Sequence, residues 1–155
     1  MNFFDSTKRR MPHFFNGVDV LEYGPHNKSK SIKHLFSDSR YTVLDPSRND
    51  LSEIDDNSFT VVFNADYFQD TPDYLCELKD MHRVSSKFVM FSCHASGNKN
   101  VSKDKYYKNL NESDFYNWLD LDRLFETYVF EVDYPTSMLY FWGVKNTDDL
   151  EGHEV

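Results

Sequence analysis

The stretch that decides the fold is VDVLEYGP, residues 18–25. Its nearly continuous apolar run is typical of a central parallel strand covered on both faces, and Gly24 marks the turn that ends it. A second unit of this kind, YTVLDPS, follows at residues 41–47. Each strand ends in a carboxylate, Glu22 in the first and Asp45 in the second. Carboxylates at the carboxyl ends of neighbouring parallel strands accept hydrogen bonds from ribose hydroxyls, so the two units predict a nucleoside pocket.

The remaining pattern continues the alternation of strands and helices. Four further strands are expected, at 59–63, 88–93, 128–132 and 138–144. Helices are expected at 28–36, from Thr71-Pro72 onward, and along the apolar stripe Phe115, Trp118 and Leu119. The five residues between the last two strands imply an antiparallel pair. The pattern therefore predicts an α/β fold, a Rossmann-like three-layer sandwich with a mostly parallel sheet and an antiparallel C-terminal hairpin.

A chain of 155 residues is expected to form one domain, spanning 1–155. Residues 1–17 alternate polar and aromatic side chains, which favours an N-terminal arm or short helix over the sheet. Residues 146–155 are expected to form a disordered tail. Aromatic residues make up 17% of the chain, so the core can be built largely from phenylalanine and tyrosine.

The charge balance bounds the partners. With 17 basic and 26 acidic residues the net charge is −9, which argues against nonspecific binding to nucleic acid or an anionic membrane. The basic run 8–10 is either a local patch or a solvated terminus. No apolar run approaches the roughly 20 residues of a membrane span, and no secretory signal is expected. Two cysteines are too few for a disulfide framework, and a cytoplasmic setting is expected.

Together these motifs resemble the class I S-adenosylmethionine-dependent methyltransferases, specifically the small type 11 methyltransferases. VLEYGP is similar to the first motif of the family and YTVLDPS to the second. The longest stretch of family pattern runs from Asp50 to Val84, and the resemblance extends from Val18 to Lys145. The segment between Asp45 and Asp50 is very short, so the fold is expected to be abbreviated in the middle, where the family has a second helix and a third strand.

The resemblance implies S-adenosylmethionine as cofactor and methyl transfer to a small-molecule or sugar-like acceptor. The residues that it implies for the methionine and ribose side are Glu22, Tyr23, Gly24 and Asp45. Those implied for the adenine side are Pro46, Ser47, Asp50 and Leu51, and those beside the sulfonium and substrate entrance are Asn64 and Ala65.

Each of these residues also has a structural interpretation. Glu22 could be a strand-end carboxylate bonded to the backbone, Asp45 an ordinary turn starter before proline, and Asp50 a solvated loop acid. His94, just past the strand at 88–93, is the candidate for a substrate-side base, and a rim histidine without a catalytic role is the alternative. No histidine pairs with a cysteine or an acid at metal-ligand spacing, so no metal is expected.

Two features, Pro25-His26 and the short segment between Asp45 and Asp50, leave the function open. Pro25-His26 stands where the family has a second glycine, and Ser85-Ser86-Lys87 replaces a Pro-Gly-Gly turn. The alternative is therefore a catalytically inactive, methyltransferase-like binding or regulatory subunit. The sequence leaves open a homo-oligomer or a protein partner. A nicotinamide dehydrogenase is distant, because it requires a G-x-G-x-x-G turn and Gly24 stands alone.

Overall fold

A computed structural model describes residues 3–24, 31–46, 48, 50–65, 67–68, 73–94, 120–133 and 135–146. Six strands form one sheet in the order β2-β1-β3-β4-β6-β5. They are β1 (Asp19–Tyr23), β2 (Arg40–Leu44), β3 (Phe59–Ala65), β4 (Ser85–His94), β5 (Phe125–Asp133) and β6 (Met138–Lys145). The first four pair in parallel, and β6 runs antiparallel to both β4 and β5. The predicted parallel sheet with an antiparallel hairpin is confirmed.

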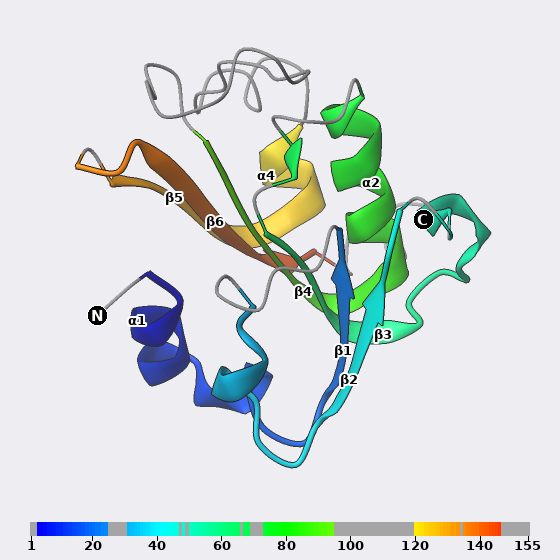
Figure 1. The fold of residues 1–155 in the computed structure, drawn as a ribbon, viewed down its shortest axis with the longest axis horizontal. Coiled ribbons are helices and arrows are strands. Elements are labelled where there is room, and N and C mark those ends of the chain that lie inside the picture. Colours follow the sequence, from blue (N-terminus) through cyan, green and yellow to red (C-terminus); the bar gives the residue numbers. More distant parts are fainter. Residues whose placement is uncertain are drawn as a thin grey trace.

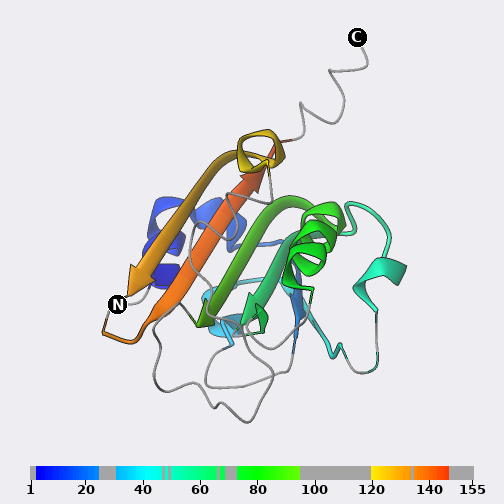
Figure 2. The same ribbon diagram turned by 90° about the horizontal axis from the view of Figure 1, so that it is seen from above.

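Helical elements cover both faces of the sheet (Figures 1 and 2). One face carries α1 (Phe3–Arg10) and the 3-10 turns η1 (Pro12–Phe14) and η2 (Lys33–Leu35). The opposite face carries α2 (Tyr74–Val84), α4 (Leu121–Leu124) and the 3-10 turn η3 (Leu51–Glu53). A separate hydrophobic cluster fills the space between the sheet and each layer, which confirms the predicted three-layer arrangement.

The N-terminal segment is part of the core rather than a loose arm. Phe4 packs edge-on against Phe63 of β3 with ring centroids 5.4 Å apart, and Phe14 stacks on Phe88 of β4 at 4.3 Å. Burial of rings this large dominates the packing of the α1 face. At the other end of the chain, Asn146 donates its backbone N–H to the Leu124 carbonyl oxygen at 2.9 Å. Residues 147–155 of the expected tail lie outside the described residues.

Helix α2 begins later than the sequence pattern predicted. Its N-cap is Asp73, whose carboxylate accepts from the Cys76 N–H at 3.2 Å, whereas Thr71-Pro72 lies outside the described residues. A short acidic side chain at this position satisfies an N–H that the first helical turn leaves unpaired. The helix ends at Val84 and β4 begins at Ser85, so Ser85-Ser86-Lys87, where the family has a Pro-Gly-Gly turn, belongs to the strand here. The third expected helix, before Asp120, also lies outside the described residues.

The first crossover is much reduced. A helix was expected over 28–36, but within the described part of that stretch the backbone makes only the single turn η2. Between β2 and β3 the described residues contain only η3, and β2 is the edge of the sheet. The prediction of a fold abbreviated in the middle is confirmed. In the described part of the chain, no helix is long and apolar enough to cross a membrane.

A buried lysine ties three elements together at the edge where β4 begins. Lys145, at the end of β6, donates to Asn57 Oδ1 and to the carbonyl oxygens of His82 and Ser85, each at 2.9 Å. The ring of His82 bonds the Leu124 carbonyl oxygen at 2.8 Å, and burial lowers the pKa of this histidine to about 4. His82 is therefore a neutral structural residue.

Candidate functional site

The glycine that ends β1 adopts a conformation that other residues avoid. Gly24 has φ +146°, and a Cβ added there would lie 3.6 Å from Asn64 Nδ2 and 3.6 Å from Tyr67 Cβ. The space is adequate, so the backbone angle is what requires glycine. Gly24 donates its N–H to the Leu44 carbonyl oxygen at 3.1 Å. The tip of β1 is thus joined to the tip of β2 at the predicted turn.

The pairing register of β1 and β2 places the ends of these two strands, where the predicted acids lie, side by side. Tyr23 pairs with Leu44 in parallel, so the residues that follow, Gly24 and Asp45, leave the sheet side by side. Both arrowheads lie at the same edge of the sheet in Figure 1. Asp45 is exposed and Pro46 is half-buried. The neighbouring placement of the two strand ends is confirmed, and the roles of Glu22 and Asp45 toward ribose stay predictions.

Glu22 is buried rather than open to solvent. Only 3% of the residue is exposed, and its Oε1 accepts from Ser31 Oγ at 2.9 Å and from the hydroxyl of Tyr41. Ser31 follows the connection that leaves Gly24, and Tyr41 lies on β2. Sequence reasoning missed both hydroxyl partners. A carboxylate inside an apolar strand does signal that a buried donor must exist, but only the register of β1 and β2 identifies it.

Asn64 presents a buried acceptor beside the glycine. The side chain is fully buried at the tip of β3, and its Nδ2 donates to the Tyr23 carbonyl oxygen at 2.9 Å. Because that carbonyl can only accept, the amide orientation is fixed. In the described part of the chain, Asn64 Oδ1 is the only buried side-chain oxygen or nitrogen without a hydrogen-bond partner. Ala65, the next predicted residue, is half-buried at the end of the strand.

Two of the predicted adenine-side residues, Asp50 and Leu51, lie beside α2, and Ser47 is outside the described residues. Asp50 is exposed and caps η3, accepting from the Ser52 N–H at 3.0 Å, and this bond lowers the pKa of its carboxyl. Leu51 is buried in the core on this face. Tyr23 is also buried there, and burial followed by the charge of Glu77 raises the pKa of its phenol. Side chains from the tip of β1, from η3 and from α2 therefore lie together on the α2 face of the sheet, at the carboxyl ends of the strands.

Glu77 is a site-edge residue that sequence reasoning missed. Burial, and after it the carboxylates of Asp80, Asp50 and Asp73, raise the pKa of Glu77 to about 7. Its position in the first turns of α2 gave no signal, because an acid near a helix N-terminus is ordinary. Only the packing of α2 beside η3 brings Glu77 and Asp50 within reach of each other's charge.

We expect Glu77→Gln to stabilise the protein at high pH. The folded state keeps the Glu77 proton up to about pH 7, whereas the unfolded chain loses it near pH 4.5, so the stability of the unmodified protein falls across that window. The variant should be more stable by about 1 kcal/mol at pH 8, after allowance for solvent screening of a half-exposed group, and equal at pH 4. Urea denaturation at both pH values measures this. The exposed Glu53→Gln is the control, and an equal gain in it would contradict the assignment.

His94 lies at the same edge. It is the last residue of β4, half-buried, and pairs with Met138 of β6. Because β4 runs parallel to β3, this position is at the carboxyl ends of the strands, where open α/β sheets bind ligands. Its role as a base stays a prediction. No group of three or more metal-ligating side chains occurs within the described ranges.

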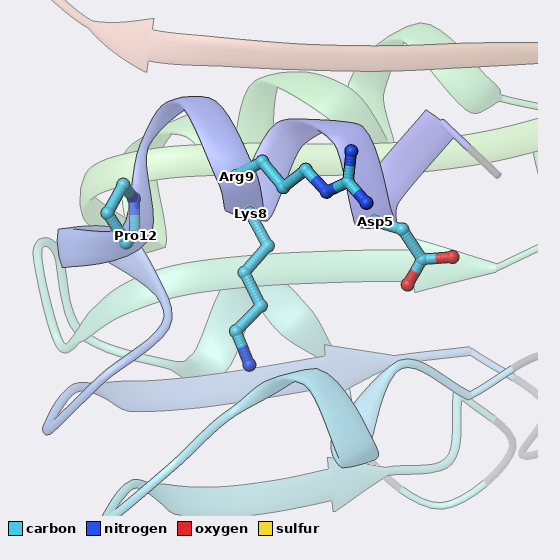
Figure 3. A pocket seen from close by; sticks show the side chains of 4 residues that line it. All are labelled: Asp5, Lys8, Arg9 and Pro12. Carbon is cyan, nitrogen blue, oxygen red and sulfur yellow. The ribbon is translucent and has the colours of Figure 1, made fainter. Parts of the chain in front are cut away.

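A surface hollow lies on α1, away from these residues. It is lined by Asp5, Lys8, Arg9 and Pro12 (Figure 3). Arg9 is exposed and Lys8 is half-buried, so the basic run is largely a solvated helix surface. None of the four lining residues is buried, which leaves nothing there to desolvate a ligand or perturb a catalytic group. We therefore place the candidate site at the strand tips.

Comparison with known proteins gives a fold but no sequence family. No family model matches the chain, and no curated protein matches it either. Among solved structures, magnesium protoporphyrin IX methyltransferase from Synechocystis PCC 6803 with bound SAH is similar, with a TM-score of 0.62 at 12% identity, covering 94% of this chain and 89% of that one. A putative type 11 methyltransferase from Sulfolobus solfataricus gives 0.59 at 16% identity, covering 94% and 92%.

A third similar structure is a complex. It joins the Haloferax volcanii Trm112 methyltransferase activator and a putative methyltransferase, with a TM-score of 0.57 at 11% identity, covering 92% of this chain and 94% of that chain. These identities are low, so the likeness establishes the fold that this chain shares with them.

Proposed function

We propose that this chain transfers a methyl group from S-adenosylmethionine to a small-molecule or sugar-like acceptor. The observation that carries the proposal is Asn64 Oδ1, a fully buried acceptor without a partner among the described residues, one strand away from the glycine turn of β1. Leaving such an acceptor unpaired costs about 1–3 kcal/mol. A ligand that brings a donor to the strand tips would recover that cost.

The described residues fit this cofactor chemically. S-adenosylmethionine carries an ammonium group, two ribose hydroxyls and an adenine amino group, all of which donate, and a positive sulfur. The edge offers acceptors: the free oxygen of Asn64 and the exposed carboxylates of Asp45 and Asp50. We assign Asp45 to the ribose and Asp50 to the adenine amino group, with Leu51 and Tyr23 as apolar walls. Gly24 and Pro46 shape the backbone around them.

Catalysis here requires mainly alignment. Bound cofactor would supply a methyl group on positively charged sulfur, so the protein has to hold the acceptor in line with it and exclude water. For a hydroxyl or amine acceptor, a base at the same edge helps to remove the proton, and His94 is our candidate. Because α1 is fixed on the sheet by Phe3 and Phe4, we assign acceptor selection to residues 95–108, which lie outside the described residues, or to a second subunit.

Calorimetry with S-adenosylmethionine and S-adenosylhomocysteine tests the proposal. We expect both to bind the purified chain, and Asn64→Ala to weaken binding about tenfold because one buried hydrogen bond to a ligand donor is lost. Asn146→Ala, which removes an amide donor to Arg123 far from the strand tips, is the matched control and should bind normally. If the unmodified chain binds neither compound, the proposal is wrong.

One observation favours a second candidate, a methyltransferase-like binding or regulatory subunit. The first crossover offers only the turn η2 in its described part, so a long helix whose N-terminus would favour an anionic cofactor group is not seen there. The similar complex with a methyltransferase activator supports a protein partner. Copurification from the native host, followed by methyl-transfer assays with and without the partner, separates the two candidates. Turnover by the isolated chain would exclude the second.

A further inference from the structure

Two hydroxyl groups converge on one oxygen of a buried carboxylate at the edge of the candidate site. Ser31 Oγ donates to Glu22 Oε1 at 2.9 Å, and the Tyr41 hydroxyl donates to the same atom. Glu22 is 3% exposed, so solvent cannot replace either donor. A buried carboxylate held by two hydroxyl donors loses its freedom to rotate.

We infer that Ser31 and Tyr41 are positioning residues, which fix Glu22 and the glycine turn so that the strand tips bind the cofactor. The inference rests on the proposed function and adds to it two residues on which cofactor affinity depends. Neither residue contacts the cofactor in this assignment. Both act through Glu22.

Ser31 ties the return of the glycine connection to β1. The chain leaves β1 at Gly24, whose N–H is held by the Leu44 carbonyl oxygen at 3.1 Å, and comes back at Ser31. The Ser31 hydroxyl also accepts from the Lys33 N–H at 3.3 Å, which links Glu22 to the start of η2. Gly24 and Ser31 are therefore both held at the neighbouring ends of β1 and β2, Gly24 by Leu44 and Ser31 by Glu22.

Tyr41 ties Glu22 to the strand that carries Asp45. Tyr41 lies on β2, opposite Val20 of β1, so its ring is on the same face of the sheet as Val20 and Glu22. The ring packs against Phe36, with centroids 5.8 Å apart, and Lys33 Nζ lies 6.0 Å from the Tyr41 centroid. β2 is an edge strand of only five residues that pairs with β1 alone, so the bond from Tyr41 to Glu22 adds a side-chain link to this pairing.

A double-mutant cycle on cofactor affinity tests the inference. Glu22→Gln, Tyr41→Phe and the double variant are titrated with S-adenosylhomocysteine by calorimetry. We expect each single variant to bind about 5- to 50-fold more weakly, because one hydrogen bond that positions the strand ends is lost. Because Tyr41 acts through Glu22, the double variant should bind no more weakly than Glu22→Gln. Losses that multiply would overturn the inference.

Matched controls separate positioning from general stability. Tyr140→Phe removes a hydroxyl from a half-buried tyrosine on β6, and Ser39→Ala removes a serine hydroxyl at the opposite end of β2. We expect both to bind S-adenosylhomocysteine normally, while Ser31→Ala binds about 5- to 50-fold more weakly at a similar unfolding temperature. Weakening that followed the unfolding temperature across all variants would contradict a positioning role.

A spectroscopic readout on the free protein is independent of the cofactor. Burial and the bond to Glu22 raise the pKa of Tyr41, so its ¹³Cζ resonance, assigned by its absence from Tyr41→Phe, should titrate at lower pH in Glu22→Gln. If this shift appears and the unmodified chain binds no cofactor, the hydroxyl pair exists but the proposed function and the positioning role are both wrong. If the unmodified chain binds S-adenosylhomocysteine and the Tyr41 resonance titrates unchanged in Glu22→Gln, only the inference is wrong.

Discussion

Replacing Lys145 by methionine should destabilise the protein by about 3 kcal/mol, which corresponds to a fall of roughly 10 °C in unfolding temperature. Methionine fills similar space but leaves three acceptors, Asn57 Oδ1 and the carbonyl oxygens of His82 and Ser85, without their shared donor. Two of these carbonyls end α2 or follow it directly, where a positive charge is favourable. Removing the burial cost of the lysine charge, which already lowers its pKa, offsets part of the loss.

The exposed Lys87→Met, on β4, is the matched control for this experiment. It should change the free energy of unfolding by less than about 0.5 kcal/mol, because surface substitutions generally do. Urea denaturation of both variants measures the difference. A Lys145→Met protein as stable as the unmodified one would mean that water replaces all three bonds and that the lysine is not a structural anchor. Cofactor binding by folded Lys145→Met should be normal, since Lys145 lies near the start of β4 and the candidate site is at the other end of the parallel strands.

Replacing Gly24 by valine should reduce S-adenosylhomocysteine affinity by more than about 100-fold, the second large effect. A β-branched residue at φ +146° is strained by roughly 1–3 kcal/mol, and the backbone relieves this by leaving that angle. The hydrogen bond from the Gly24 N–H to Leu44 would then break, and the tips of β1 and β2 would separate. Calorimetric titration measures the loss of binding.

Gly17→Ala is the matched control for the glycine turn. Gly17 also has a positive φ, +66°, but it lies before β1 begins and a Cβ there meets nothing within 4 Å. We expect it to cost about 1 kcal/mol of stability and to leave cofactor binding unchanged. Equal loss of binding in both variants would show that general destabilisation, rather than the geometry of the strand tip, is responsible.

The sequence predicted the parts of the site that depend on the order of strands along the chain. A strand ending in a carboxylate and a glycine, followed by a second strand ending in Asp45, was enough to place two tips side by side, because short parallel strands joined in sequence become neighbours. The sequence did not predict what surrounds Glu22. Ser31 and Tyr41 lie nine and nineteen residues away from it, and nothing in local periodicity pairs a hydroxyl with a carboxylate over that separation.

Misplaced helices have a similar cause. The pattern at 28–36 has helical spacing, yet Ile32 and Leu35 are buried from a single 3-10 turn, because short helices gain most of their stability from packing rather than propensity. The strand expected from residue 88 begins at Ser85 instead. Ser85 is fully buried and its hydroxyl donates to the His82 carbonyl oxygen at 2.9 Å, so the helix passes directly into the strand.

The sequence by itself determined the alternation of apolar strands, the antiparallel closing hairpin and the position of the glycine turn, because these depend on residues close together in the chain. Only the tertiary structure decided which side chains share an environment. Gly143 illustrates this: a Cβ there would lie 2.6 Å from Phe125 Cδ1, although MLYFWGVK by itself indicates only a strand. The same holds for the unpaired oxygen of Asn64, for the Glu22 oxygen that accepts two hydrogen bonds and for the raised pKa of Glu77. Burial and charge proximity are properties of packed neighbours, and packing brings together residues that the linear order keeps apart.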